Sequence, residues 1–225
     1  MPVAAIFAHP DDEVLGAGGA IAFHAARQDD VHVMLMAVGL EARGPTTKAQ
    51  MIELRSQAER AADTLGAKSI TFGDFPDNAM DTLPLLDVVK HVETFLSEHS
   101  IETIYTHHGG DLNIDHRIVH QAVLTACRPL PSRVGLHLLA GEIPSSTEWA
   151  VAPLAAFSPT NFLDISSTLA TKLEALACYA SELREWPHPR SLRGVETLAR
   201  WRGCQSGLDA AEAFITLRSV HHDIG

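Results

Sequence analysis

The sequence predicts an α/β fold with a Rossmann-like, mostly parallel sheet, helices on both faces and an elaborated C-terminal third. Two observations carry this prediction. Short apolar runs alternate with longer segments in which apolar residues recur at helical spacing, which is typical of strand–helix repeats with right-handed crossovers. The runs are continuously apolar, as in strands buried on both faces of a sheet. We expect strands at residues 3–8, 31–38, 69–72, 101–106 and 136–140.

Helical patterns fill the intervals between these strands. The first helix is expected from the segment 13–19 to about residue 27. The second follows Thr47, which forms a capping-box pattern with Gln50, and it ends before Gly66, a residue suited to a left-handed C-terminal cap. The third and fourth helices are expected at about 85–99 and 116–127.

Beyond residue 128 prolines interrupt short segments, and the alternation of strand and helix patterns becomes less regular. We expect no internal repeat and no linker, and therefore a single domain over residues 1–225. The elements expected in this part are a strand at 162–165, a helix from 166 or 167 to about 183, a rigid turn at 187–191, a helix to about 203 and a last strand within 213–220.

Composition narrows the class of protein. The formal net charge of −11 argues against broad binding to nucleic acid or to an anionic membrane, because both need a basic face. The three cysteines are far apart and form no CxxC pair, which suits reduced thiols in the cytoplasm. No signal peptide is recognisable, and no apolar run approaches the roughly 18 residues of a membrane span. We expect a cytoplasmic protein that acts on a small molecule, either alone or as a homo-oligomer.

The most informative residues follow the first expected strand, in the run Ala-His-Pro-Asp-Asp-Glu that begins at residue 8. Ligands of open α/β sheets bind at the carboxyl ends of the strands. His9 and Asp12 supply two of the three protein ligands that a catalytic metal takes, and Asp11 is left to move protons. We expect the third ligand to be His116, at the start of the fourth helix. His120, one turn later, is an alternative third ligand, but we expect it to pack against neighbouring residues or to support the metal ligands from behind.

These motifs resemble the LmbE-like, or PIG-L, family of zinc-dependent deacetylases, and further similarities extend the resemblance over nearly the whole chain. They are the segments 15–19 and 211–214, and Arg55 with Glu59 before Leu65-Gly66. The resemblance implies a Rossmann-like fold and hydrolysis of N-acetyl groups on substrates that contain N-acetylglucosamine. It also implies that His9, Asp12 and His116 bind zinc and that Asp11 is the general base.

One position departs from the family pattern. Many members carry a histidine three residues before the metal-binding histidine, where it assists the oxyanion, but this chain has Asn113. The amide of Asn113 donates instead, or the role falls to His107, His108 or His188. We keep Asn113 and His188 as catalytic candidates, and His188 stands in a proline-braced turn with Arg190.

Three further residues are candidates for binding substrate: Arg55, Asp115 and Arg190. Arg55 fits equally well as an ion-pair partner of Glu59 on a helix face, and Asp115 as a helix cap.

The glycine-rich segment 16–19 lacks the last glycine of the dinucleotide-binding pattern, so we interpret it as close helix packing. The tryptophans are candidates either for a sugar-stacking platform or for core and interface packing. They are Trp149, Trp186 and Trp201.

We therefore predict a metal-dependent amide hydrolase that removes an acyl group, most often acetyl, from an amino sugar or its conjugate. Zn²⁺ is the expected cofactor, although a mixed nitrogen and oxygen ligand set also accepts iron, manganese or cobalt. Two alternatives stay open. One is an amidase that cleaves a glucosamine-linked thiol conjugate at the same site. The other is a non-catalytic, metal-dependent sugar-binding protein, against which the unliganded Asp11 argues.

Overall fold

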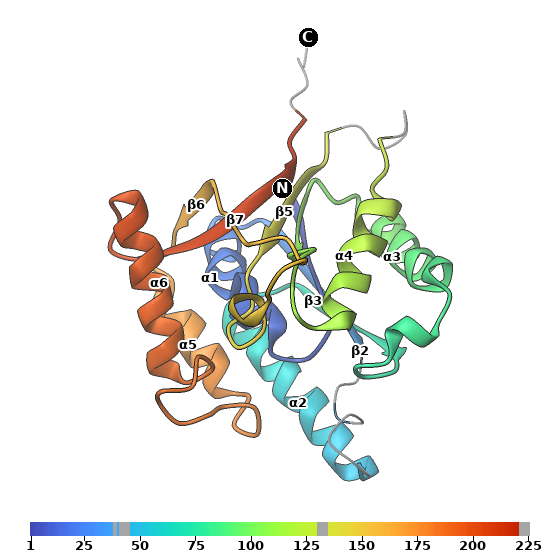
Figure 1. The fold of residues 1–225 in the computed structure, drawn as a ribbon, viewed down its shortest axis with the longest axis horizontal. Coiled ribbons are helices and arrows are strands. Elements are labelled where there is room, and N and C mark those ends of the chain that lie inside the picture. Colours follow the sequence, from blue (N-terminus) through green and yellow to red (C-terminus); the bar gives the residue numbers. More distant parts are fainter. Residues whose placement is uncertain (38–39, 41–45, 130–134, 221–225) are drawn as a thin grey trace.

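The computed structural model describes residues 1–37, 40, 46–129 and 135–220, and these form an α/β arrangement around one mixed sheet (Figure 1). Within the described residues this sheet has seven strands in the order β3-β2-β1-β4-β5-β7-β6. Six of them run in the same direction, and β7 is antiparallel to both of its neighbours, which confirms the predicted fold class. The strands are β1 (Pro2–Phe7), β2 (Asp30–Ala37), β3 (Ser69–Phe75), β4 (Thr103–His107), β5 (His137–Gly141), β6 (Asn161–Asp164) and β7 (Ala211–Arg218).

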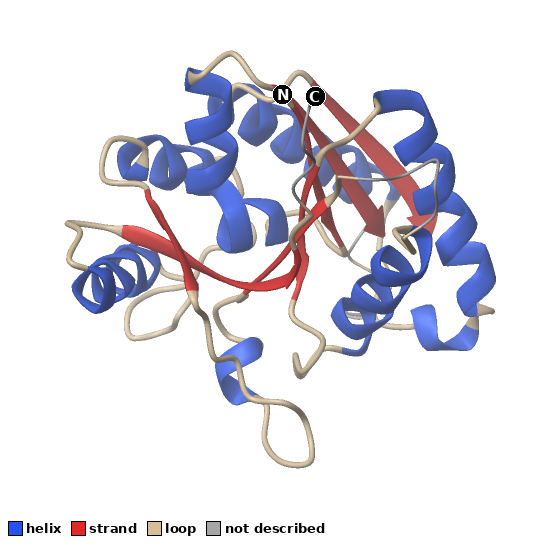
Figure 2. Ribbon diagram, turned by 90° about the horizontal axis from the view of Figure 1, so that it is seen from above, coloured by secondary structure: helices blue, strands red, loops and turns tan. Residues whose placement is uncertain are grey.

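Helices cover both faces of the sheet (Figure 2). One face carries α1 (Asp12–Ala26), α2 (Lys48–Leu65) and α5 (Leu169–Ala177), and the other carries α3 (Leu85–His99) and α4 (Ile114–Ala126). The last helix, α6 (Leu192–Ser206), contacts α5 and β7. Single 3₁₀ turns, η2 (Met80–Thr82) and η3 (Thr147–Trp149), complete the elements. No helix among the described residues has the length and apolarity needed to cross a membrane.

Strand β1 shows why the strand runs are continuously apolar. Its residues alternate between two separate cores, so every position is buried. Val3, Ala5 and Phe7 pack with α1, α2 and α5. Ala4 and Ile6 pack with α3 and α4. A strand covered on both faces has no solvent side and therefore no polar alternation.

The strand order reverses between β1 and β4. From β1 the chain builds outward through β2 and β3, and it then returns to the opposite side of β1 to form β4. The carboxyl ends of β1 and β4 flank this reversal, which is the position where open α/β sheets bind ligands. The segments that leave these two strand ends carry His9 and His116.

Most predicted elements are confirmed within two residues at each end, and position 38 of the expected second strand lies outside the described residues. Thr47 and Gln50 form the predicted capping box, and Gly66 ends α2 at φ 77°. The helix expected to about residue 183 is wrong in its second half, because α5 ends at Ala177. A tertiary contact accounts for the early end, since the Tyr179 hydroxyl donates a hydrogen bond to Glu13 inside the core.

Two glycines of α1 allow close packing, which confirms the interpretation of the segment 16–19. A Cβ on Gly19 would lie 2.6 Å from Cγ2 of Ile165, and one on Gly16 would lie 2.7 Å from Cδ1 of Ile143. Both distances are below 3.0 Å, which Cβ atoms essentially never show to a non-bonded neighbour, so a side chain at either position would displace that neighbour.

We expect Gly19→Ala to lower the free energy of unfolding by about 1–3 kcal/mol, the usual cost of overpacking a core. This loss exceeds the gain of about 1 kcal/mol that alanine brings to a helix interior. Urea unfolding measures the difference. Gly18→Ala is the matched control, because its Cβ would meet the flexible side chain of Lys172 at 3.2 Å. Equal stability of the two variants would contradict the packing argument.

Candidate metal centre and active site

A polar cavity of about 190 Å³ opens where the strand order reverses. It is built from the segment after β1, the start of α4, the segment after β5 and two residues of the C-terminal third. Six of the predicted site residues line it: His9, Asp11, Asp12, Asn113, His116 and Arg190. The other lining residues are Pro10, Leu15, Asp77, Asn78, Ile143, Pro144, Ser145, Ser146 and Glu182.

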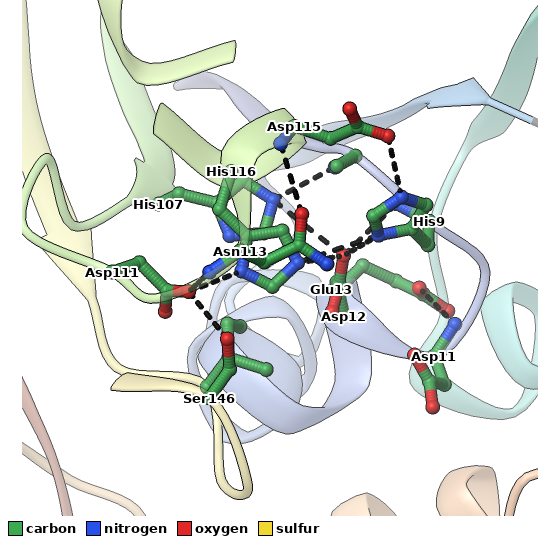
Figure 3. A network of polar contacts seen from close by, with 12 residues as sticks. His9, Asp11, Asp12, Glu13, His107, Asp111, Asn113, Asp115, His116 and Ser146 are labelled. Atoms are coloured by element: carbon green, nitrogen blue, oxygen red, sulfur yellow. Dashed lines mark hydrogen bonds and ion pairs between the residues drawn. The ribbon is translucent and has the colours of Figure 1, made fainter. Parts of the chain in front are cut away.

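Three donor atoms converge at one side of this cavity (Figure 3). His9 Nδ1 lies 3.2 Å from Asp12 Oδ2, and His116 Nε2 lies 3.2 Å from the same oxygen. The two nitrogens are 3.3 Å apart. A tetrahedral cation with bonds of about 2.0–2.1 Å holds its ligands roughly 3.3–3.4 Å apart. His9, Asp12 and His116 therefore form a candidate metal site whose donor spacing fits a single divalent cation.

The second nitrogen of each imidazole faces a buried carboxylate. His9 Nε2 lies 3.0 Å from Asp115 Oδ2, and His116 Nδ1 lies 3.0 Å from Asp111 Oδ1. Carboxylate partners of this kind fix the orientation of a ligating ring and raise its basicity. Asp115 is fully buried and does not line the cavity. The structure thus places Asp115 behind His9 rather than against the space available to a substrate.

His9 also belongs to a second donor group, with Asp77 and Asp115, on the opposite side of its ring. His9 Nε2 lies 3.3 Å from Asp77 Oδ1. A hydrogen bond from His9 to Asp115 requires a proton on Nε2, whereas a cation held by this second group would need Nε2 without that proton. A cation there would therefore break the hydrogen bond to Asp115. The cluster of His9, Asp12 and His116 leaves the bond intact and is the better candidate for a cation.

Sequence reasoning missed Asp111, although it lies in the loop between β4 and α4 that leads to the second motif. Its carboxylate accepts hydrogen bonds from Ser146, from Thr147 Oγ1 at 2.5 Å and from the backbone N–H of Asn113 at 2.8 Å. Burial raises the pKa of Asp111, but bonds with His116 and the two hydroxyls outweigh it and lower the pKa to about 2. Its position five residues before His116 was the available signal, whereas the hydroxyl partners come from beyond β5.

Asp11 lies to one side of the donor cluster and has a strained backbone (Figure 3). Its φ of 102° is in the left-handed region, which is costly for a residue other than glycine. The backbone N–H of Asp11 donates to Glu13 Oε2 at 3.1 Å, and Glu13 Oε1 accepts from Tyr179 at 2.5 Å. Glu13 thus holds the turn, and this turn presents the Asp11 carboxylate to the cavity.

The electrostatics of Asp11 suit proton transfer. Burial and the neighbouring Asp12 carboxylate raise the pKa of Asp11 well above its ordinary value, and Arg190 offsets part of this rise. Arg190 Nη1 lies 3.3 Å from Asp11 Oδ2 and 3.7 Å from Glu182 Oε2. A carboxyl group whose pKa moves toward neutrality is a better acceptor for the proton of a water molecule.

Asn113 and the nearby histidines have clear hydrogen-bond partners. Asn113 begins α4, where Oδ1 accepts from the Asp115 N–H and Nδ2 donates to Asn78, both at 2.9 Å. His107 is buried, accepts from the Ala8 N–H and stacks on His116 at a centroid distance of 3.9 Å. The other two histidines of this region bond to backbone carbonyls: His108 to Ala155 at 2.9 Å and His120 to His107 at 2.8 Å.

Besides Asp115, two predicted residues do not line the cavity. Arg55 pairs with Asp74 of β3 at 3.1 Å rather than with Glu59, and its guanidinium lies over the ring of Phe72. His188 accepts a hydrogen bond from the backbone N–H of Arg190 at 3.1 Å. The substrate-binding role of Arg55 and the catalytic role of His188 thus gain no support from their positions.

Both imidazoles of the donor cluster are strong bases in this setting. Burial by itself lowers the pKa of His9, but contacts with Asp115 and Asp12 outweigh it and raise the pKa to about 10. Burial likewise lowers the pKa of His116, and Asp12 with Asp111 raises it to about 9. The ordinary value is 6.5 for each. Protonated rings therefore hold the carboxylates together when no cation is bound.

We expect the melting temperature of the chelator-treated protein to fall as the pH rises from about 7 to about 10. The protonated rings of His9 and His116 stabilise the fold fully when the pH is below 6.5, the ordinary histidine pKa. This stabilisation is lost as the pH rises through about 9 and about 10, the pKa values of the two rings in the folded protein. Circular dichroism melts across this range measure the effect. His116→Gln removes one of the two titrating groups and flattens the curve. A melting temperature that rises over the same range would contradict the assigned direction.

The structure first defines a class of protein: a Rossmann-like α/β protein with a candidate His/Asp metal site at the reversal of the strand order. Comparison with known proteins then identifies the family. Residues 4–127 match the profile of PIG-L, described as GlcNAc-PI de-N-acetylase. The chain belongs to this family, as its motifs indicated.

Individual relatives differ in the reaction they are named for. The chain is 32% identical over 202 residues to 4-oxalmesaconate hydratase of Pseudomonas putida, covering 81% of this chain and 74% of that protein. It is 29% identical over 138 residues to the uncharacterized deacetylase YaiS of Escherichia coli, covering 59% of this chain and 71% of the relative.

Solved structures show the same division. GalB, the 4-carboxy-2-hydroxymuconate hydratase of Pseudomonas putida, superposes with a TM-score of 0.77 at 25% identity, covering 100% of both chains. The N,N'-diacetylchitobiose deacetylase of Pyrococcus horikoshii has a TM-score of 0.76 at 20% identity, covering 96% of this chain and 83% of the other. The latter similarity shows the fold alone. Family membership therefore establishes the architecture and leaves the reaction to the chemistry of the site.

Proposed function

We propose that this protein is a metal-dependent enzyme that hydrolyses an N-acyl amide, chiefly N-acetyl, on an amino sugar or its conjugate. The observation that carries the proposal is the Asp11 carboxylate, which faces the cavity next to the donor cluster but is not part of it. A protein that only bound a sugar through a metal would have no use for such a base.

His9, Asp12 and His116 would hold the cation, which we propose to be Zn²⁺. A divalent cation bound there lowers the pKa of water and polarises a carbonyl group. Asp115 and Asp111 act behind the two imidazoles, because each has a carboxylate oxygen 3.0 Å from the ring nitrogen that faces away from the cluster. Their part is to fix the tautomer and the orientation of the rings.

Asp11 would act first as base and then as acid. Its carboxylate accepts a proton from the attacking water, and the resulting carboxyl returns that proton to the leaving nitrogen. The second step is needed because an amide nitrogen leaves readily only as a neutral amine. Asn113 is proposed to bond the developing oxyanion, since Nδ2 carries a second hydrogen beyond the one given to Asn78. Arg190 positions Asp11 and offers its guanidinium to substrate oxygens.

A second reaction has specific support. Hydration of an unsaturated carboxylic acid is favoured by the relative at 32% identity, which is named 4-oxalmesaconate hydratase. Arg190 could pair with one substrate carboxylate. We rank this reaction second because the cavity also presents Asp11, Asp77 and Glu182, which disfavour a polyanion.

The two reactions are separated by their products. The Zn²⁺-loaded protein is incubated with N-acetylglucosamine, N,N'-diacetylchitobiose and a thiol conjugate of glucosamine, and acetate and free amine are measured. A parallel reaction with 4-oxalmesaconate follows the absorbance of the unsaturated acid. Metal-dependent acetate release that requires Asp11 supports the first proposal. Loss of the unsaturated acid without any amide cleavage supports the second, and activity that survives both chelation and Asp11→Ala overturns the mechanism.

A further inference from the structure

The segment after β5 forms one wall of the catalytic cavity and carries none of the roles proposed above. Its lining residues are Ile143, Pro144, Ser145 and Ser146. A buried carboxylate ties this segment to the donor cluster. Asp111 Oδ1 lies 3.0 Å from His116 Nδ1, and the hydroxyl groups of Ser146 and Thr147 donate to the same carboxylate. Side-chain hydrogen bonds therefore fix the position of this wall relative to the candidate metal site.

Further hydrogen bonds close the segment into a tight turn. Glu148 Oε1 accepts from the backbone N–H of Ser145 at 2.6 Å, and Oε2 accepts from that of Ser146 at 3.3 Å. The Ile143 N–H donates to Thr147 Oγ1 at 2.8 Å. The Ile143 carbonyl accepts from the Thr147 N–H at 2.9 Å. The backbone conformation of Ser145 is thus imposed by bonds on both sides of it in the chain.

This imposed conformation is strained. The φ of Ser145 is 68°, in the left-handed region. Five residues other than glycine have such a φ in the described part of the chain, and three of them line the cavity: Asp11, Asn78 and Ser145. Aspartate and asparagine adopt this region more readily than serine does. Ser145 is therefore the least tolerated of the three, and strain of this kind is typical of functional sites.

The hydroxyl group of Ser145 is available to a ligand. Only the backbone N–H of Ser145 is hydrogen-bonded, and the described residues offer its hydroxyl no partner. A hydroxyl group donates one hydrogen bond, which an ionised carboxylate cannot do. Ser145 therefore suits a substrate oxygen that accepts, whereas the carboxylates of the same cavity suit substrate groups that donate. The carboxylates outside the donor cluster are Asp11, Asp77 and Glu182.

We propose that Ser145 is a substrate-binding residue, whose hydroxyl group donates a hydrogen bond to an oxygen atom of the substrate in the catalytic cavity. This inference rests on the function proposed above, which supplies the substrate. The bonded turn holds the residue in place before the substrate arrives, so binding costs little conformational freedom. One hydrogen bond between neutral groups changes an affinity by about two- to tenfold.

Ser100 is a matched control for Ser145. It is also a serine with a left-handed backbone, at φ 49°, and it stands at the C-terminal end of α3. A left-handed residue is common at that place in a helix. Ser100 is exposed and does not line the cavity. Substitutions of Ser100 therefore reproduce the backbone effect without a change in the active site.

Calorimetric titration of the Zn²⁺-loaded protein with N-acetylglucosamine, together with acetate release, tests this role. Ser145→Ala is expected to weaken binding and to lower kcat/KM by about two- to tenfold. Ser145→Gly is expected to show the same loss and to raise the melting temperature by roughly 2–4 °C, because glycine relieves the strain. Ser100→Gly should raise the melting temperature alone, and Ser100→Ala should bind the sugar as the wild type does.

Unchanged binding in both Ser145 variants would overturn the inference, and so would equal losses in the Ser100 variants. Binding at the wild-type level by Ser145→Gly alone would assign the effect to the backbone instead of the hydroxyl group. Binding that depends on Ser145 without acetate release would keep this role and reject deacetylation, whereas acetate release that ignores Ser145 would do the reverse. If the sugar does not bind, the same variants are titrated with 4-oxalmesaconate. Failure of the wild type to bind either probe would overturn both proposals.

Discussion

Asp11→Asn is expected to lower kcat by a factor of about 10²–10⁴, the usual contribution of a positioned general base. The amide of asparagine has the shape of the carboxylate but accepts no proton. The substitution leaves the strained backbone, at φ 102°, in a conformation that asparagine tolerates better than most residues. Zn²⁺ content and KM should change little, because Asp11 is not among the clustered donor atoms. Steady-state kinetics with metal analysis measures all three quantities.

The pH profile separates a base from a structural residue. Burial raises the pKa of Asp11, so activity of the wild type should fall on the acid side of that pKa, as the carboxylate becomes protonated. The asparagine variant should lose this limb. Asp77→Asn is the control, because Asp77 is another carboxylate that lines the same cavity. A comparable loss of kcat in the Asp77 variant, or an unchanged acid limb in the Asp11 variant, would count against the assigned base.

Binding of Zn²⁺ is expected to release more than one proton per ion at pH 7, and the apparent affinity should rise more than tenfold per pH unit up to about pH 9. The pKa of His9 is raised to about 10 and that of His116 to about 9, so both rings are protonated at pH 7. A ring must lose a proton from the nitrogen that ligates. Asp12 contributes no proton, because the neighbouring imidazoles hold its pKa well below the ordinary value.

Calorimetry in buffers of different ionisation enthalpy counts the released protons. His116→Gln removes one donor and one titrating ring, so it should release fewer protons and bind the ion far more weakly. His120→Gln is a suitable control, since His120 lies on the same face of α4 but bonds to the His107 carbonyl and is not among the clustered donors. Binding without proton release, or affinity that is flat between pH 7 and 9, would show that the cation sits elsewhere.

Part of the donor cluster was predictable because the spacing of His9 and Asp12, three residues apart on one turn, is local. The helix expected at about 116–127 placed His116 at the same edge of the sheet, since it follows the next strand to reach that edge. The parallel fold was predictable for a similar reason, since strands buried on both faces leave a continuous apolar run.

The surroundings of the cluster were not predictable. Arg190 reaches Asp11 across 179 residues, and Tyr179 reaches Glu13 across 166. Tyr179 also explains why α5 ends at Ala177, since the buried hydroxyl contact competes with helix propensity. Local patterns carry no information about such pairs, because their distance depends on how α5 and the turn after it pack on α1.

The sequence by itself predicted the class of fold, because strands buried on both faces are continuously apolar. It also named the three metal-donor candidates and the carboxylate proposed as the base, because they follow the ends of two expected strands. Only the tertiary structure decided that Asp111 and Asp115 lie behind the two imidazoles, that Arg55 stays on the surface beside Asp74, and that Arg190 pairs with Asp11. These are contacts between distant segments, and they come into being only when packing of the two cores brings the ends of β1, β4 and β5 together.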